Sequence, residues 1–221
     1  MPLITEELFL LLRNDEGRLE RYGTATGYGL TAAMITDLML AGRLGLTDDK
    51  QPRLRVLSTQ PTGNPVLDPG LAQLADRDGD KLRSLITKNS LNPEQRVAES
   101  LAAAGIVELG GKGFLGMGRE RTPVLNPMPE QQLRARLAAV LAGSTPPTVA
   151  DSTLLSVLQG LQVARYVLKQ ESGGANGRQL GNRIEQVVRS TPAGDAVAKA
   201  VQAMNAAVMT AAIMPVIATS N

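Results

Sequence analysis

The sequence contains no cysteine, histidine or tryptophan, and aromatic residues make up only 2% of it. Without cysteine the chain can form no disulfide, thiolate metal site or cysteine nucleophile. Without histidine it lacks imidazole metal ligands and the commonest general base. Leucine, alanine, valine, isoleucine and methionine must therefore fill the core, and we expect neither a metal nor another cofactor.

The chain has little net charge. Its formal charge is +2, from 23 basic and 21 acidic residues, which is too small to indicate nucleic-acid binding by itself. Its length of 221 residues and its hydrophobic content of 43% are sufficient for one sizeable core. We expect a single domain over residues 1–221. Arginine outnumbers lysine, which is compatible with a GC-rich bacterial gene.

Long hydrophobic runs are also missing near the N-terminus. The apolar run at residues 8–12 is short, and Glu6 and Glu7 stand where a signal peptide would carry cations. Residues 201–218 are uncharged, but much of their bulk is alanine and they include Gln202 and Asn205. Alanine contributes little to membrane insertion, so we expect a core helix here and a cytoplasmic protein, with at most a peripheral place at a membrane.

Apolar residues at helical spacing predict a mainly α-helical fold, resembling a helical bundle with short β-hairpins. Thr5 is a candidate cap for the first helix, Gly42 a stop signal for the second, and Asn92 a cap followed by proline. The helices are expected at residues 5–12, 30–41, 69–75, 80–87, 93–104, 129–142, 149–169, 178–189 and 195–217.

Two segments have the patterns of strands. Residues 53–59 alternate and end at a Pro-Thr-Gly turn. Residues 106–109 and 122–125 flank the glycine-rich stretch 110–118, which predicts a β-hairpin with its tip in that stretch.

Several short motifs in order resemble the Golgi phosphoprotein 3 family, in a bacterial-type form. The strongest is the stretch at residues 22–46, with glycines at 23, 27 and 29 before an apolar helix, preceded by Glu7-Leu-Phe-Leu-Leu-Leu-Arg-Asn-Asp-Glu-Gly17. Further matches follow at the family's spacing: Pro61-Thr-Gly63, Leu67, Asp68, Leu71, Leu101, Gly105, Phe114-Leu115 and Pro123. The resemblance implies a non-enzymatic peripheral membrane protein that binds phosphatidylinositol 4-phosphate.

The resemblance also implies a lipid head-group pocket. The family builds it from a tryptophan and three arginines, which suit a phosphate because a guanidinium forms bidentate, charge-assisted bonds. In this sequence the corresponding positions hold Tyr22, Thr31, Leu91 and Glu94, with Arg96 as the basic residue nearby. Each lost charged hydrogen bond is worth ~1.5–3 kcal/mol, so we expect a degraded phosphate pocket.

A second membrane element implied by the resemblance is the hairpin tip. It corresponds here to Phe114, Leu115 and Met117, flanked by Lys112, Arg119 and Arg121 and opposed by Glu120. Burying each apolar side chain would contribute up to ~1.5–3 kcal/mol, and each basic residue near an anionic surface about 1 kcal/mol. This predicts weak, reversible binding to anionic lipid. The same hairpin could instead pack on a protein partner or a second copy, and these interpretations stay open.

Other motifs are weaker. Thr31 and the start of the helix at 30–41 form a candidate anion site, although we favour glycines 27 and 29 as shaping a tight loop only. Gly111-x-Gly113-x-x-Gly116 matches a dinucleotide fingerprint, but no strand-helix context surrounds it.

Two further function classes compete with lipid binding. A helix at 94–104 beside a basic hairpin resembles a winged helix, but Glu94 and Glu99 make its face poor for phosphates, so we do not expect nucleic acid as a partner. Carboxylates in the expected loops are ordinary solvated residues, and no base–nucleophile pair can be named, so we expect no enzyme.

Overall fold

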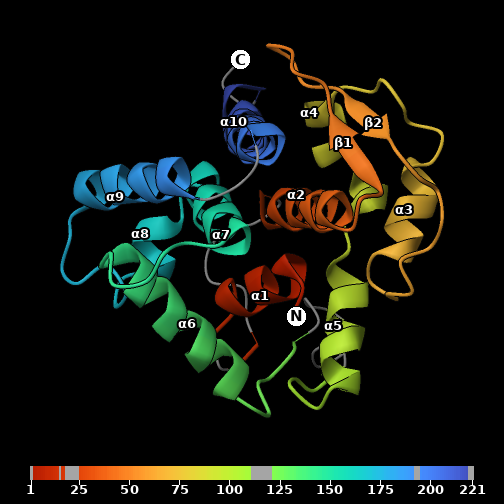
Figure 1. Cartoon of the computed structure of the whole chain (residues 1–221). Coiled ribbons are helices and arrows are strands. Elements are labelled where there is room, and N and C mark those ends of the chain that lie inside the picture. Colours follow the sequence, from red (N-terminus) through yellow and green to blue (C-terminus); the bar gives the residue numbers. More distant parts are fainter. Residues whose placement is uncertain (1, 15, 18–24, 111–120, 192–194, 219–221) are drawn as a thin grey trace.

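The computed structural model describes the chain except residues 1, 15, 18–24, 111–120, 192–194 and 219–221 (Figure 1). Within the last helix it describes side chains at positions 201–212.

Helices dominate the structure. The elements in chain order are α1 (Ile4–Leu11), α2 (Ala25–Leu40), β1 (Leu44–Leu46), β2 (Leu54–Val56), α3 (Asp68–Leu74), α4 (Leu82–Ile86), the 3-10 helix η1 (Asn89–Leu91), α5 (Glu94–Ala103), α6 (Met128–Leu141), α7 (Val149–Gly160), α8 (Ala164–Val167), α9 (Gly177–Ser190) and α10 (Asp195–Ala218). The strands β1 and β2 pair antiparallel, with Gly45 opposite Arg55. The mainly α-helical fold class predicted from the sequence is confirmed.

The helices pack in a layered arrangement around α2 and α7. On one side α10 lies against both of them, and on the other side α1 does, with α5 and α6 flanking α1 (Figure 1). One cluster of buried apolar side chains runs through these layers and includes residues from Ile4 to Ala211. The first helix of the chain is therefore a core element rather than a surface one.

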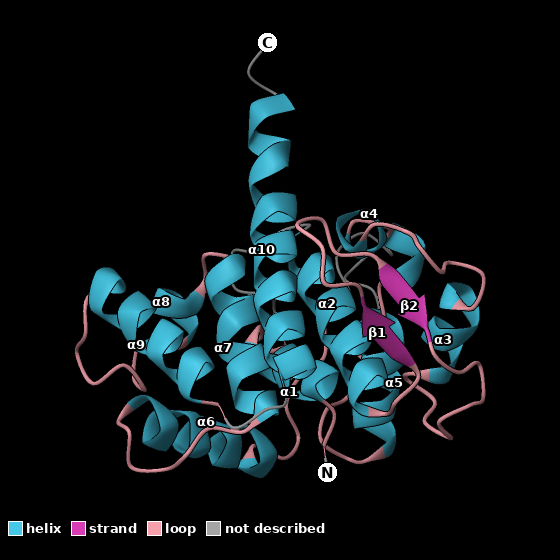
Figure 2. Cartoon of the chain, turned by 45° about the horizontal axis from the view of Figure 1, so that its top comes forward, coloured by secondary structure: helices cyan, strands magenta, loops and turns pink. Residues whose placement is uncertain are grey.

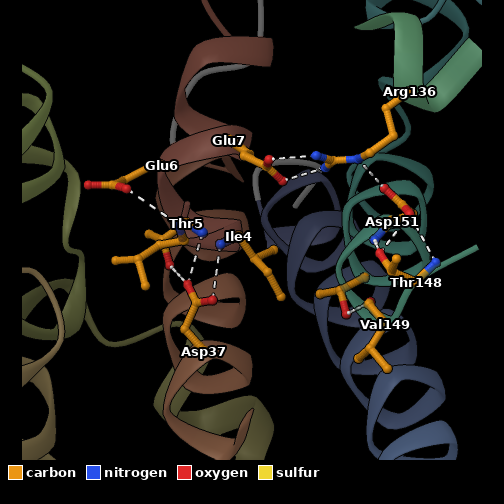
Figure 3. Close-up of polar contacts among 11 residues, drawn as sticks. Ile4, Thr5, Glu6, Glu7, Asp37, Arg136, Thr148, Val149 and Asp151 are labelled. Atoms are coloured by element: carbon orange, nitrogen blue, oxygen red, sulfur yellow. Dashed lines mark hydrogen bonds and ion pairs between the residues drawn. The ribbon is translucent and has the colours of Figure 1, made fainter. Parts of the chain in front are cut away.

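The N-terminus of α1 is capped by a carboxylate from α2. The two oxygens of Asp37 accept hydrogen bonds from the backbone N–H groups of Ile4 and Thr5, each at 3.0 Å, and from the Thr5 hydroxyl at 2.6 Å (Figure 3). The prediction that Thr5 itself caps this helix is wrong, because Thr5 lies in its first turn and donates to Asp37. Burial raises the pKa of Asp37 to about 6. The hydrogen bonds from Thr5 and Ile4 lower this pKa, but their effect is smaller than that of burial.

A carboxylate of α1 itself, that of Glu7, is bound by an arginine of α6. Both terminal nitrogens of Arg136 donate to the Glu7 carboxylate, at 3.0 and 2.7 Å, and its Nε donates to Asp151 on α7 at 2.7 Å (Figure 3). Asp151 also closes the N-terminal cap of α7 by accepting from the backbone and hydroxyl of Thr148. Glu7 and Asp151 are buried while Arg136 is partly exposed, so loss of the arginine would leave two buried carboxylates without their charged partner. This arginine of α6 therefore joins α1 to α6 and α7, which are distant from α1 in sequence.

Several helix boundaries agree with the sequence prediction. Gly42 has a φ of +68°, which ends α2 where expected. Asn92 precedes α5 as expected and its side chain accepts from the Glu94 backbone N–H at 3.1 Å, but the capping position itself is held by Pro93, so the predicted Asn92 cap is displaced by one residue. The helix expected at 80–87 is shorter, as α4, and the strand expected at 53–59 is reduced to β2.

Two boundary predictions are wrong. The helix expected at 149–169 is interrupted after Gly160, because Gln162 adopts a φ of +61° and the chain restarts as α8. The helix expected to begin at Leu30 begins at Ala25, so Gly27 and Gly29 lie inside α2 rather than in a loop. Their lack of a side chain serves packing: a Cβ at Gly29 would lie 2.8 Å from Leu161 Cδ1.

We expect Asp37 to make the free energy of unfolding depend on pH. Its folded pKa of about 6 exceeds the ordinary value of 3.8. Its contribution therefore favours the folded state fully below the ordinary value and is lost as pH rises through the folded value. At about 1.4 kcal/mol per pKa unit, the stability advantage of the wild type over Asp37→Asn should shrink by up to about 3 kcal/mol between about pH 4 and 7 in urea unfolding.

Asp68→Asn is the matched control. The Thr62 hydroxyl, which donates to Asp68, lowers the pKa of that carboxyl below its ordinary value. Its titration therefore lies below the tested range, and the difference between wild type and this variant should stay constant. An Asp37→Asn difference that is equally constant would contradict the raised pKa.

Candidate functional site

Arg13 lies just after α1, and its buried side chain contacts the start of α5. Its guanidinium carbon lies 3.5 Å from the centre of the Phe9 ring, and its Nη2 donates to Glu94 Oε1 at 2.5 Å. Stacking on an aromatic ring and bonding to a carboxylate restrict a guanidinium to one orientation. The chain just after α1 therefore presents a fixed cation to the first residue of α5.

The first turn of α2 meets the same place. A Cβ on Gly27 would lie 2.9 Å from Asn92 Nδ2, at the end of that side chain, so the first turn of α2 lies directly against Asn92. Asn92 Nδ2 in turn donates to Glu94 Oε2 at 3.4 Å. The end of α1, the start of α2 and the start of α5 thus converge, and we call Arg13, Gly27, Asn92 and Glu94 the head-group corner.

The positions predicted for the lipid pocket fall partly on this corner. Glu94 belongs to it, and Leu91 is a buried core residue of η1 just before it. Arg96 lies on α5. Its Nε and Nη2 are buried, and neither donates a hydrogen bond to any of the described residues. Tyr22 lies outside the described residues. The structure therefore brings the second half of the predicted pocket close to the start of α2.

The candidate anion site at Thr31, which the sequence analysis did not favour, does not lie at a helix start. Thr31 is buried within α2, and its hydroxyl donates to the Gly27 carbonyl at 2.9 Å. Because α2 begins at Ala25, Thr31 lies beyond the first turn, where the backbone N–H groups are already used inside the helix. The hydroxyl and N–H groups of that candidate site are thus committed to the helix.

Arg13 is the residue of this corner that the sequence analysis missed. Its spacing from Phe9 fits an i, i+4 contact on a helix, which is a local signal for stacking. Its partner Glu94 lies 81 positions further along the chain, and no local pattern connects the two. The carboxylate at position 94 therefore does more than replace a basic residue: it also pairs with the guanidinium of Arg13.

The arms of the predicted hairpin are paired. Glu108 N–H donates to the Pro123 carbonyl at 2.9 Å, Gly110 N–H donates to the Arg121 carbonyl at 2.8 Å, and Val107 forms an isolated bridge with Val124. The two ends of segment 111–120 are therefore adjacent. The tip residues Lys112, Phe114, Leu115, Met117 and Arg119 lie outside the described residues, and Arg121 is exposed at the base.

The turn after α1 packs against this base. Gly17 has a φ of +69°, and a Cβ there would lie 2.1 Å from the Thr122 carbonyl carbon. Thr122 N–H donates to the Gly17 carbonyl at 3.4 Å. The hairpin base and the head-group corner are thus both attached to the chain that leaves α1.

A cavity of about 770 Å³ opens beside Arg13 and the hairpin base. Leu11 and Val124 form part of its wall, with Arg134, Tyr166 and Lys169 from α6 and the α8 region. Arg134 donates to Glu130 at 2.8 Å and to Glu171 at 3.0 Å. Burial lowers the pKa of Arg134, but these hydrogen bonds outweigh it and raise the value above the ordinary one. Two of the cations at this cavity are therefore neutralised by carboxylates.

The described residues show no group of histidine, cysteine, aspartate and glutamate side chains that could hold a metal ion. Within the same residues, no helix is both long and apolar enough to cross a membrane.

Comparison with known proteins gives one family. The model of the family described as Golgi phosphoprotein 3 (GPP34) matches residues 4–204, which is nearly the whole chain. A search of curated proteins found no match.

Gly17→Ala should separate the turn after α1 from the hairpin base. The added Cβ would clash with the backbone of Thr122, and the positive φ of Gly17 already disfavours any residue with a side chain. We therefore expect the free energy of unfolding to fall by at least about 3 kcal/mol. Gly105→Ala is the control, because Gly105 has the same φ of +69° but no atom within 4 Å of its added Cβ. Its cost should be strain alone, about 1–2 kcal/mol. Equal losses in urea unfolding would show that the contact with Thr122 is unimportant.

Proposed function

Because this chain belongs to the Golgi phosphoprotein 3 family, we propose that it is a non-enzymatic protein that binds anionic membrane surfaces through the hairpin at residues 107–124. The observation that carries the proposal is the pairing of the two hairpin arms, which brings the ends of the apolar and basic tip segment together at one point of the fold. A tip held at both ends can enter a lipid surface without unfolding the rest of the chain.

The tip has the composition for weak interfacial binding. Phe114, Leu115 and Met117 supply apolar area worth up to ~1.5–3 kcal/mol each. Lys112 and Arg119 each add about 1 kcal/mol near an anionic surface, although Glu120 opposes them. After the costs of association, this supports reversible binding that depends on lipid charge and on salt.

The head-group corner supports only weak recognition of a phosphorylated inositol. Its buried guanidinium, Arg13, already bonds to Glu94 at 2.5 Å, so a lipid phosphate would have to displace a carboxylate from it. Arg96 supplies a further cation, with two nitrogens that none of the described residues accepts from. We therefore propose generic selectivity for anionic lipid, with little preference for phosphatidylinositol 4-phosphate.

Vesicle flotation tests the proposal. The full chain is mixed with neutral phosphatidylcholine vesicles, with vesicles containing phosphatidylglycerol, or with vesicles containing phosphatidylinositol 4-phosphate, at low and physiological salt. We expect recovery on both anionic vesicles, reduced by salt, and none on the neutral ones. Phe114→Ser with Leu115→Ser should abolish recovery without changing the unfolding midpoint.

Leu125→Ser with Met128→Ser is the stringent control, because these exposed apolar side chains lie just beyond the hairpin base. This variant should float like the wild type. Recovery that survives the tip substitutions, or that is lost equally in the control, would refute insertion of the tip. No recovery of the wild type on any vesicle would favour a protein partner or a second copy at the hairpin.

A further inference from the structure

An apolar groove lies on the face of the molecule formed by α2, the two strands and α10. It has a volume of about 470 Å³. Two of its leucines are large and exposed, Leu40 by 44% and Leu57 by 63%. Its apolar wall is made by Met39, Leu40, Leu44, Leu46, Leu57 and Val201. Exposed leucines gathered at one groove favour a surface that is covered in the working state of the protein.

Helix α10 continues beyond the part that packs on the core. Its inner face is buried at Val201, Met204, Val208 and Ala211, while the helix itself extends to Ala218. At 1.5 Å per residue, the last seven residues project about 10 Å further, and Figure 2 shows this end of α10 rising out of the body of the molecule. The sequence of this end is Ala-Ile-Met-Pro-Val-Ile-Ala, and none of the side chains that follow Lys199 is charged.

The projecting end and the groove cannot meet within one molecule. Val201, near the start of α10, lines the groove, whereas the projecting end begins eleven residues later on the same continuous helix. A helix of that length is rigid and spans about 16 Å between these points, so its end cannot fold back onto its own start. The groove of another copy does not have this restriction.

A two-fold arrangement satisfies both surfaces at once. If two α10 helices pack antiparallel, the end of each helix lies beside the start of the other, which is where the groove is. The outward side chains midway along α10 are Ala206, Met209 and Thr210, two of which are small enough for helices to approach closely. Such an interface is isologous, so each copy both offers a helix end and receives one.

We propose that this chain forms a two-fold symmetric dimer in which residues 212–218 of each copy occupy the groove at Leu40 and Leu57 of the other. This surface is separate from the hairpin, so the proposal stands independently of membrane binding. A membrane is the competing occupant for the helix end. Seven apolar residues are about a third of what a span needs, and a membrane would leave the groove uncovered.

The oligomeric state of the full chain tests the proposal. Light scattering coupled to gel filtration at ~100 µM should give the mass of a dimer. Leu57→Glu, and a chain ending at Ala212, should each give a monomer. Both variants should fold, because Leu57 is 63% exposed and the truncation keeps the buried residues up to Ala211. Leu125→Glu is the matched control, since Leu125 is 60% exposed but outside the groove, and it should remain a dimer.

Mixing the two monomeric variants tests the exchange of helix ends. Leu57→Glu retains an intact helix end, and the truncated chain retains an intact groove, so a mixture should form a weak heterodimer with one of the two contacts. A wild-type monomer at this concentration would overturn the proposal, as would a Leu57→Glu variant that stays dimeric. Flotation of a monomeric wild type that is lost on truncation at Ala212 would assign the helix end to lipid instead.

Discussion

The fold depends on the satisfaction of the polar groups of one buried helix. Helix α1 carries its backbone ends and the Glu7 carboxylate into the core, where each unpaired group would cost several kcal/mol. Asp37 accepts from the first N–H groups of α1, and Arg136 binds Glu7 and Asp151 together. These two clusters come from α2, α6 and α7, so the position of α1 fixes the relative positions of the helices around it (Figure 3).

The same helix determines where the functional elements lie. The residues just after its last turn place Arg13 over Phe9 and against Glu94, and the turn that follows places Gly17 against Thr122 at the hairpin base. The head-group corner and the hairpin are therefore connected through one short segment of chain. A change that moves the end of α1 is expected to affect both, whereas changes at α10 should affect neither.

The sequence predicts the helical class and the end of α2 well, because a glycine that adopts a positive φ acts locally: Gly42 ends that helix where expected. The prediction fails where a contact with a distant part of the chain determines a helix cap or a helix boundary. The cap of α1 comes from Asp37 rather than from Thr5, and Gly27 lies within α2, against Asn92, rather than in a loop. Of the candidate site, Glu94 was found through the family resemblance, but its pairing with Arg13 depends on tertiary contact that no spacing reveals.

The central functional claim is that Glu94 neutralises the buried cation of the head-group corner and so limits phosphoinositide selectivity. The most direct measurement compares flotation of wild type, Glu94→Gln and Glu99→Gln on vesicles with equal charge from phosphatidylglycerol or phosphatidylinositol 4-phosphate. Glu99 lies on the exposed side of the same helix, so its variant controls for the loss of one negative charge. Our account predicts that Glu94→Gln alone gains recovery on the phosphoinositide relative to phosphatidylglycerol. An equal gain for both variants, or no gain for Glu94→Gln, would contradict it.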